Sequence, residues 1–418
     1  MAEARNIRDY AIITATYWAF TLSDGALRML VLLHLHQLGH SPLTLAMLFV
    51  LYEFFGMVTN LFGGWLGARS GLKITLGYGL LLQVIACGLL ALADGWLSVA
   101  LVTALQGLSG IAKDLTKMSS KSYIKMVVPE GDQAGLLRWV ALLTGSKNTL
   151  KGGGYFLGGL LLSTTGFHEA CGVMSIALAL TLAASMLALP KAPGKAKASV
   201  SLRSLIPTDA RLGWLSAARL FLFGSRDTWF VVGLPVFLSA TLGWSFEAVG
   251  AALALWIVGY GIVQASAPAF LGLKTSPGDE RHQRPVAGKL LGRWKAALII
   301  PLAAIALGLE QGAPAQPTLI GGLVIFGIIF ATNSALHSFL VVDYAEKDSV
   351  ALSVGFYYMS NAAGRLVGTV LSGVLFESLG GDLPGLLACI AGAMVMVSLS
   401  TLLCIPLSRA EHAFNAAR

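Results

Sequence analysis

Residues 170–189 read ACGVMSIALALTLAASMLAL, an apolar run without a single charged side chain. A helix of roughly 20 residues crosses the hydrocarbon core of a bilayer. Runs of this kind recur along the whole chain of 418 residues, of which 56% are hydrophobic and 12% are charged. Since a soluble domain carries about 25% charged residues, the sequence excludes a soluble enzyme and a peripheral protein. An outer-membrane barrel is excluded as well, because its strands would be short and alternating in polarity.

Twelve apolar runs predict an all-α polytopic membrane protein with twelve transmembrane helices. We place these helices at residues 11–36, 43–67, 74–93, 97–120, 139–164, 170–189, 212–239, 246–271, 294–310, 318–341, 350–375 and 385–407. Between the sixth and seventh runs, the segment PKAPGKAKASVSLRSLIPTD is basic and rich in Pro, Ala and Ser. The chain therefore divides into an N-terminal six-helix half at residues 1–189, a basic cytoplasmic linker at 190–211 and a C-terminal six-helix half at 212–418.

The two predicted halves carry a weak internal repeat. Asp24 is followed by LGHS from Leu38, and Asp227 by LGWS from Leu242 at nearly the same distance. Internal repeats of this kind are typical of secondary transporters, whose substrate site lies near the midplane of the bilayer.

Basic residues predict the orientation of the chain. Of its 29 Lys and Arg residues, 21 lie in loops on the side of the N-terminus or at the ends of the chain, and the opposite loops carry none. By the positive-inside rule, both termini and the linker are cytoplasmic, as in a multi-pass protein of a bacterial-type inner membrane. The pI of about 9.3 thus reflects topology, and no nucleic-acid-binding pattern is present.

Charged residues inside the predicted spans are the costliest feature of the sequence. An Arg, Lys or Asp at the centre of a transmembrane helix costs roughly 2.5–3.5 kcal/mol on translocon scales. The embedded residues must therefore face a watery cavity or one another. They are Asp24, Arg28, Glu53, Lys113, Asp114, Lys117, Lys147, Lys151, Arg219, Arg226, Asp227 and Arg365.

Helical spacing brings several of these residues onto one face. Asp24 and Arg28 are four residues apart, and so are Lys147 and Lys151. One interpretation is that the embedded charges form buried ion pairs that hold the bundle together. The pairs would be Asp24 with Arg28, Lys113 with Asp114, and Arg226 with Asp227.

Ion pairing alone cannot account for the embedded set, because it holds four acids and eight bases. Unpaired buried charge needs a partner, and the planar fork of Arg matches carboxylate, phosphate or arsenate oxygens. We therefore predict a small, multiply charged anionic substrate. Its predicted ligands are Arg28, Lys113, Lys117, Lys147, Lys151, Arg219, Arg226 and Arg365. The acids Asp24, Glu53, Asp114 and Asp227 are predicted ion-pair or coupling groups, and Asn333 and His337 are candidate polar cavity residues, His337 being equally compatible with a satisfied core histidine.

No catalytic residue, metal site or cofactor is predicted, so the chain is not interpreted as an enzyme. Its four cysteines are isolated and form no metal-binding spacing. No Walker A motif occurs, so any transport would be driven by a gradient or a partner. Glycines around Lys151, from Gly152 to Gly159, predict close helix packing, and the alternative is that they let a ligand approach the backbone beside Lys151.

The loop Gly64–Lys73 (GWLGARSGLK) resembles the loop signature of the major facilitator superfamily. Arg69, Gly71 and Lys73 fit that signature, whereas Ala68 stands where the family has an acid. The resemblance implies the major facilitator fold, with cavity-lining first, fourth and seventh spans. The change at Ala68 removes the acid of the usual gating charge relay.

Several longer segments resemble the ArsJ-type organoarsenical efflux permeases of that superfamily. They are YWAF from Tyr17, DGALRMLVLL from Asp24, YEFFGMVTN from Tyr52, GIAKDLTKMSSK from Gly110, LTGSKNTLKG from Leu143, SRDTWFVVGLPVF from Ser225 and FYYMSNAAGR from Phe356. The resemblance implies export of 1-arseno-3-phosphoglycerate, arsenate resistance, and dependence on a glyceraldehyde-3-phosphate dehydrogenase that makes the substrate. Such a substrate agrees with the excess of embedded bases and the lack of a cysteine cluster.

Three alternatives remain open at this point. The chain could instead be an organophosphate:phosphate exchanger or a general organic-anion exporter on the same fold. A non-transporting membrane sensor or scaffold is an alternative of another class. For an exporter, Glu53 is the carboxyl that we expect to couple export to proton entry, unless it is a structural partner of Lys147 or Lys151.

Overall fold

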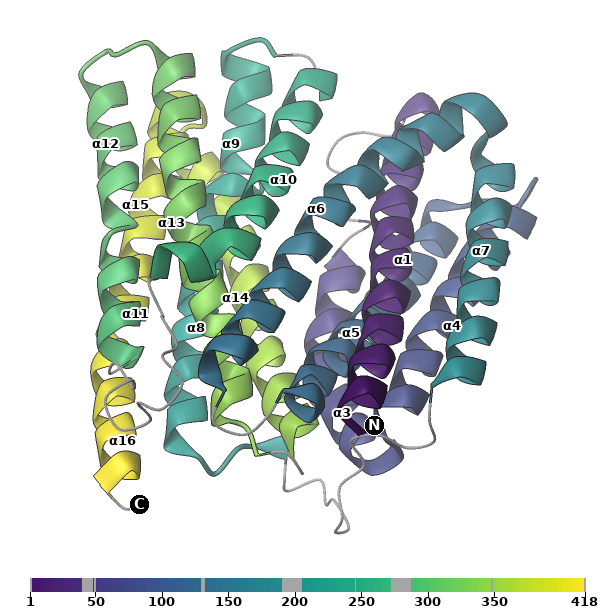
Figure 1. The fold of residues 1–418 in the computed structure, drawn as a ribbon. Coiled ribbons are helices and arrows are strands. Elements are labelled where there is room, and N and C mark those ends of the chain that lie inside the picture. The colour runs from purple at the N-terminus through teal and green to yellow at the C-terminus, as the bar shows by residue number, and fades with distance from the viewer. Residues whose placement is uncertain are drawn as a thin grey trace. The chain divides into compact units, whose positions relative to one another are not determined.

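The computed structural model describes residues 2–39, 48, 50–128, 132–189, 205–244, 246–271, 287–346 and 349–416. Over these ranges the secondary structure is helical, and no strand occurs in them (Figure 1). The predicted all-α fold is thereby confirmed. Most of the predicted linker, residues 190–204, and the start of the predicted span 43–67 lie outside the described residues.

Contacts divide the chain into two compact units. Unit 1 comprises Met1–Ile206 and Ala345–Met359, and unit 2 comprises Pro207–Tyr344 and Ser360–Arg418. These units differ from the predicted halves chiefly in residues 345–359, which belong to unit 1.

Unit 1 is built on six long helices. They are α1 (Ala2–Gln37), α3 (Val50–Ser70), α4 (Leu72–Leu92), α5 (Val99–Val127), α6 (Gln133–Thr165) and α7 (Phe167–Ala188). Helix α1 packs on α6, and α4 packs on both α5 and α7. The first residues of α14 (Val350–Ser378) complete the unit.

Unit 2 contains the remaining helices and the rest of α14. They are α8 (Ala210–Phe230), α9 (Gly233–Val236), the π-helix η2 (Phe237–Thr241), α10 (Phe246–Leu271), α11 (Ala287–Ala296), α12 (Ile299–Glu310), α13 (Ala315–Tyr344), α15 (Asp382–Leu402) and α16 (Cys404–Ala416). Helix α8 packs on α15, and α13 packs on α10 and α12.

Three predicted spans of unit 2 contain a break in the helix, and each break has a proline as its cause. Proline lacks an amide hydrogen, and its ring clashes with the carbonyl four residues earlier. Pro235 follows the break between α8 and α9, Pro301 the break between α11 and α12, and Pro406 the break between α15 and α16. In each case the carbonyl four residues earlier lies at the break or beside it.

Two glycines make the tight connections of unit 1. Gly71 joins α3 to α4 with a φ of 91°, and Gly166 joins α6 to α7, also at 91°. Glycine adopts this left-handed region without steric cost. The segment predicted as the loop Gly64–Lys73 is helical apart from Gly71, because α3 runs to Ser70 and α4 begins at Leu72. The Lys73 ammonium donates to the carbonyl of Leu189 at the end of α7, 2.5 Å away.

The glycines of α6 let it approach α1 closely, as predicted. A Cβ on Gly154 would lie 2.4 Å from the Leu22 carbonyl oxygen, and one on Gly158 would lie 2.3 Å from that of Ala26. Gly25 of α1 faces the carbonyl of Lys151 in the same way. Only residues without a side chain fit at these contacts, so the glycines set the distance between the helices that carry Asp24 and Lys151.

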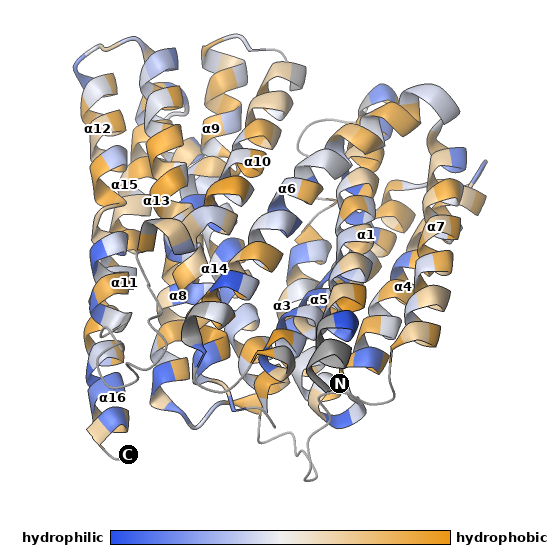
Figure 2. Ribbon diagram, viewed as in Figure 1, coloured by the Kyte–Doolittle hydropathy of each residue, from blue (hydrophilic) through white to orange (hydrophobic). Residues whose placement is uncertain are grey.

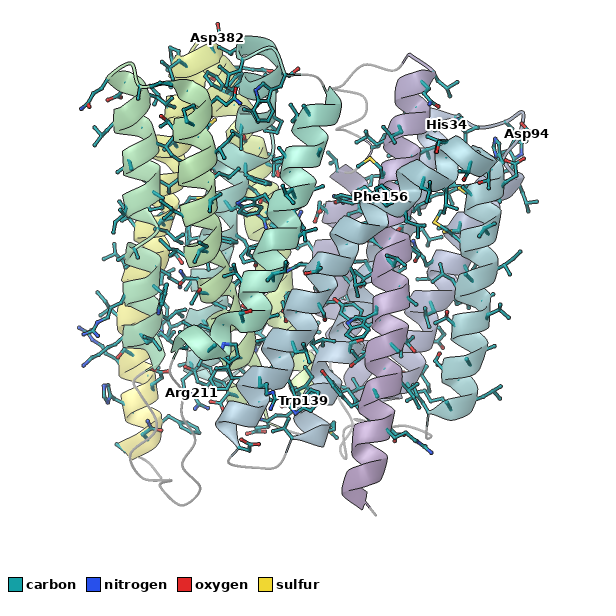
Figure 3. The ribbon with its side chains drawn as sticks, turned by 45° about the horizontal axis from the view of Figure 1, so that its top comes forward. His34, Asp94, Trp139, Phe156, Arg211 and Asp382 are labelled. Atoms are coloured by element: carbon teal, nitrogen blue, oxygen red, sulfur yellow. The ribbon has the colours of Figure 1, made fainter. Side chains whose placement is uncertain are left out.

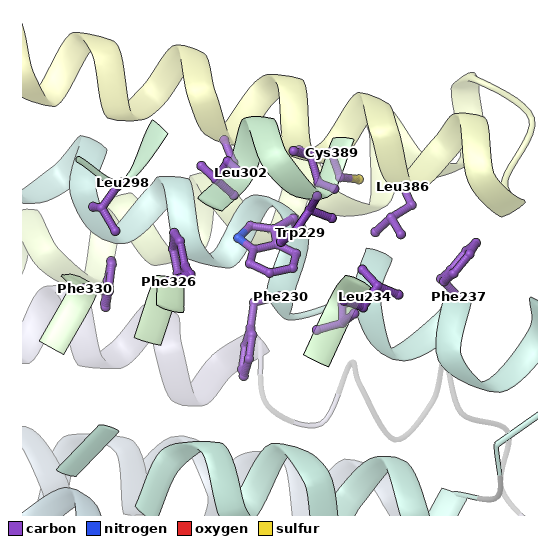
Figure 4. Close-up of a cluster of buried hydrophobic side chains, with 14 of the residues drawn as sticks. Trp229, Phe230, Leu234, Phe237, Leu298, Leu302, Phe326, Phe330, Leu386 and Cys389 are labelled. Atoms are coloured by element: carbon purple, nitrogen blue, oxygen red, sulfur yellow. The ribbon is translucent and has the colours of Figure 1, made fainter. Parts of the chain in front are cut away.

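The apolar interior of unit 2 is rich in aromatic rings (Figure 4). The rings of Trp229 and Phe326 meet edge to face with centroids 5.4 Å apart, and Phe326 stacks on Phe330 at 5.4 Å. Such pairs add about 0.5–1.5 kcal/mol each beyond the area that they bury. This cluster fixes the part of α8 that precedes its break.

Seven helical segments are long and apolar enough to cross a membrane by length and composition alone. They include α4 and α7 in unit 1, and α7 is mostly apolar in Figure 2. The five other predicted spans correspond to α1, α3, α5, α6 and α14, which carry Arg28, Glu53, Lys113, Lys151 and Arg365 respectively. Figure 3 marks the ends of unit 1, with His34 and Asp94 at one end and Trp139 at the other.

Candidate functional site

Asp24 is the buried carboxylate of α1 in unit 1. Its Oδ1 accepts a hydrogen bond of 2.7 Å from the Tyr52 hydroxyl. Its Oδ2 lies 3.4 Å from the ammonium of Lys151 on α6. Asp24 thus joins three helices, and the partner found for it across the helices is Lys151.

Arg28, one turn further along α1, lies against α3. Its guanidinium is 3.6 Å from the Glu53 carboxylate and 4.5 Å from the centre of the Tyr52 ring. Lys113 of α5 approaches the same two groups, at 3.9 Å from Glu53 and 3.8 Å from the Tyr52 ring. Glu53 is therefore positioned as an ion-pair partner of Arg28 and Lys113, and Tyr52 adds cation–π contacts.

Asp114 is the second buried carboxylate of α5. It lies 3.5 Å from Lys113 and accepts a hydrogen bond from Lys117. Gly56 of α3 makes room for it, because a Cβ there would lie 2.5 Å from Asp114 Oδ2. The predicted pairing of Lys113 with Asp114 is present.

Lys121 continues this line of lysines, one turn beyond Lys117. Its side chain is buried, and its ammonium donates to the hydroxyl of Tyr358, at the start of α14. Lys117 also lies 4.3 Å from the centre of the Tyr358 ring. The sequence interpretation placed Lys121 in a cytoplasmic loop, yet its four-residue spacing from Lys117 was a usable signal.

Lys147 on α6 is half-buried and is the exception among these bases. Within the described part of the chain, no carboxylate lies within ion-pair distance of it. The positive charges of Lys113, Lys117, Lys121 and Lys151 act on it. The network of unit 1 contains more bases than acids: Arg28, Lys113, Lys117, Lys121, Lys147 and Lys151 against Asp24, Glu53 and Asp114.

Asp227 is the buried carboxylate of unit 2. Arg226 approaches its Oδ1 at 2.5 Å, and Arg365 of α14 approaches its Oδ2 at 3.1 Å. The predicted pairing of Arg226 with Asp227 is therefore present, and Arg365 shares the same carboxylate. Because it contains two guanidinium groups and one carboxylate, this cluster carries a net positive charge.

Arg219, two turns before Arg226 on α8, is almost fully buried. It donates to Asn361 Oδ1 at 2.8 Å and to Ser334 Oγ at 3.2 Å. Its guanidinium lies 3.6 Å from the centre of the Phe223 ring, and that of Arg226 lies 5.0 Å from the same ring. Phe223 thus lies against both arginines, which are seven residues apart and share one face of α8.

The two polar candidates on α13 are both fully buried. Asn333 donates to the carbonyl of Trp294 at 2.8 Å, so that one of its roles is to tie α13 to α11. His337 experiences the positive charges of Lys295 and Arg219.

Lys295 of α11 is a basic residue that the sequence interpretation assigned to the cytoplasmic side, and it is fully buried. Its ammonium donates to the Ser400 carbonyl at 3.3 Å and contacts the Cys404 sulfur at 3.4 Å. The bases Arg219, Arg226, Lys295 and Arg365 and the acid Asp227 are thus buried or half-buried in unit 2, as are Arg211 and Glu411. Lys295 lies four residues after Leu291 and three before Leu298, which are both buried, so helical spacing could have placed it on the buried face.

Among the described residues, no group of three or more His, Cys, Asp or Glu side chains could hold a metal ion. The four cysteines are free and buried. Long membrane-compatible helices with ionisable side chains gathered in their interior define a membrane transporter.

The chain matches the Major Facilitator Superfamily over residues 13–309 and therefore belongs to it. It is a multi-pass secondary transporter of this superfamily, and the predicted fold class is confirmed. A comparison with curated proteins finds no match.

Solved structures with the same fold cover almost the whole chain. A bacterial homologue of the iron transporter ferroportin, in an outward-facing state, has a TM-score of 0.72 at 13% identity, covering 96% of this chain and 100% of its own. The human organic anion transporter MFSD10 has a TM-score of 0.68 at 17% identity, covering 97% and 100%. The proton:xylose symporter XylE has a TM-score of 0.68 at 13% identity, covering 96% and 95%. At these identities the likeness concerns the fold alone.

Proposed function

We propose that this transporter exports a multiply charged organic anion, 1-arseno-3-phosphoglycerate, and thereby confers resistance to arsenate. The observation that supports the proposal best is the excess of basic over acidic side chains among the buried and half-buried charges that interact around Asp24, Glu53 and Asp114 in unit 1 and around Asp227 in unit 2. An unpaired buried cation costs several kcal/mol unless it finds a counter-ion. A polyanionic substrate supplies that counter-ion, and its binding is favoured where bases outnumber acids.

The chemistry of the substrate agrees with the kinds of side chain present. A phosphate and an arsenate ester offer oxygen atoms, which Arg binds with paired hydrogen bonds and Lys binds as a point charge. An arsenite carrier would instead use soft thiolate ligands. Cys87 and Cys171 lie near each other on α4 and α7, but among the described residues no group of three or more metal-binding side chains occurs. A drug/proton antiporter is disfavoured, because cationic drugs require an interior with net negative charge.

We also propose the orientation that the basic loops predict, with both termini in the cytoplasm. The end of unit 1 that carries Arg138 and Lys73 would face the cytoplasm. The end that carries His34 and Asp94 would face outward. In this orientation the substrate made in the cytoplasm enters from the side on which the chain carries most of its basic residues.

Arsenate resistance in cells tests the proposed substrate. Cells that lack their own arsenic exporters should gain resistance to arsenate when they express this chain together with a glyceraldehyde-3-phosphate dehydrogenase. They should gain none from the chain in a strain without that enzyme, and none against arsenite in either strain. Resistance to arsenite from this chain alone would contradict the proposal. Resistance to arsenate without the dehydrogenase would favour a general organic-anion exporter or a phosphate exchanger.

A further inference from the structure

Five lysines of unit 1 lie on two neighbouring helices with regular spacing. Lys113, Lys117 and Lys121 follow one another at four-residue intervals along α5, and Lys147 and Lys151 do so along α6. Residues four apart share one face of a helix. Helices α5 and α6 are in contact. Tyr52 links the two lines, because Lys113 lies 3.8 Å from the centre of its ring and its hydroxyl donates to Asp24, the ion-pair partner of Lys151. The two lines of ammonium groups therefore face a common region of unit 1.

The carboxylates of this region are already engaged. Asp24 is 3.4 Å from Lys151, Glu53 is 3.6 Å from Arg28, and Asp114 accepts from Lys117. Lys121 instead donates to a neutral hydroxyl, that of Tyr358. Among the described residues, no carboxylate lies within ion-pair distance of Lys147.

Lys147 is also exposed enough for a ligand to reach, as are Lys113 and Lys151, which carboxylates already engage. It is half-buried, whereas Lys117 and Lys121 are buried, and it stands one helical turn from Lys151. Three ammonium donors on a flexible stem suit a tetrahedral group with several charged oxygens. A singly charged carboxylate would neutralise only one base of a group that has three more bases than acids.

We propose that Lys147, supported by Lys117 and Lys121, binds the tetrahedral oxyanion group of the substrate, a phosphate or arsenate ester. This inference rests on the proposed transport of an anion and adds the position at which its doubly charged group binds. Lys147 is then a specificity residue, which distinguishes a phosphorylated acid from the same acid without its phosphate.

Binding of 3-phosphoglycerate and of glycerate to the purified, detergent-solubilised protein tests this assignment. The Lys147→Gln variant should bind 3-phosphoglycerate about tenfold to a hundredfold more weakly, as expected for the loss of a charge-assisted hydrogen bond. Its affinity for glycerate, which lacks the phosphate, should stay within about twofold of the unmodified protein. The Lys147→Arg variant keeps the charge and should retain most of the affinity for 3-phosphoglycerate.

Arg138→Gln is the matched control, since Arg138 is an exposed base on the same helix. It should leave both affinities unchanged. Competition by inorganic phosphate and by arsenate separates the two esters. Displacement of 3-phosphoglycerate by both ions supports a site for either ester, and displacement by one ion assigns the site to that ester.

Two results would overturn the assignment while sparing the proposed function. In one, Lys147→Gln binds 3-phosphoglycerate as tightly as the unmodified protein does. In the other, it loses affinity for glycerate and 3-phosphoglycerate equally. Failure of the unmodified protein to bind any of these anions would overturn the proposed function as well. Melting temperatures of the variants show that each is folded before binding is compared.

Discussion

The Nε of Arg365 lies 3.1 Å from Oδ2 of Asp227, although 138 residues separate the two along the chain. Asp227 has no exposed surface, and Arg226 occupies its other oxygen at 2.5 Å. One carboxylate therefore holds two guanidinium groups in place between α8 and α14. Without this carboxylate, the positive charges of both arginines would be less well compensated in the interior of unit 2.

Replacement of Asp227 by Asn should destabilise the protein strongly. Removing one partner of a buried ion pair costs about 3–5 kcal/mol, because the remaining charge is left uncompensated. Thermal unfolding of the purified protein measures the effect. The double variant Asp227→Asn with Arg365→Gln should recover part of the lost stability, and an equal loss in the single and double variants would contradict the ion pairing.

A side chain at Gly154 should disrupt the contact between α1 and α6. The Cβ of Gly154→Ala would lie 2.4 Å from the Leu22 carbonyl oxygen, whereas that of Gly153→Ala would lie 3.9 Å from its nearest neighbour, a Leu22 methyl carbon. Overpacking of this kind costs about 1–3 kcal/mol. We expect a lower melting temperature for Gly154→Ala and an unchanged or higher one for Gly153→Ala. Equal behaviour of the two variants would show that this close contact does not contribute to stability.

Glu53 is expected to act as an ion-pair partner. Export of a polyanion from a cell that is negative inside gains about 2.3 kcal/mol per charge per 100 mV, so a uniporter is sufficient. With Arg28 at 3.6 Å and Lys113 at 3.9 Å, Glu53 has basic partners on two other helices. Glu53→Gln should therefore lower the melting temperature and leave the pH dependence of export in energised vesicles unchanged. Loss of that pH dependence would instead identify Glu53 as the proton-coupling group.

Lys295→Met should not destabilise unit 2. The Lys295 ammonium is fully buried against a carbonyl oxygen and a sulfur atom, and it experiences the charge of Arg219. Burying a charge without a counter-ion is costly, and Met has a similar shape without the charge. The melting temperature of the variant should equal or exceed that of the unmodified protein. A clear decrease would show that Lys295 makes a stabilising contact that Met cannot replace.

Apolar runs were sufficient to predict the helices of this protein, because the length of a membrane-crossing helix is set by the bilayer. The run predicted at 246–271 coincides with α10, Phe246–Leu271. Breaks inside spans were missed, since hydropathy does not register the carbonyl that a proline displaces. Pro235, Pro301 and Pro406 were nevertheless visible in the sequence and could have predicted them.

The charged residues of the candidate site were found for a different reason: ionisable side chains inside apolar runs are rare and costly. Ion pairs between neighbouring residues of one helix, such as Arg226 and Asp227, could be predicted from the distance between the two residues in the sequence. The pairing of Asp24 with Lys151 could not, because it depends on how α1 and α6 pack. Lys121 was not included among the embedded residues because it directly follows the predicted span 97–120. In the structure it is buried beside Tyr358.

Uptake of arsenic into everted membrane vesicles tests the central claim, export of an anionic organoarsenical, most directly. Vesicles that contain the protein are supplied with arsenate, glyceraldehyde 3-phosphate, NAD and a glyceraldehyde-3-phosphate dehydrogenase, so that the arseno-ester forms at their outer, formerly cytoplasmic, face. We predict accumulation of arsenic that requires the dehydrogenase and is lost in the Arg226→Gln and Arg365→Gln variants. Equal accumulation without the dehydrogenase, or no accumulation with it, would contradict the account.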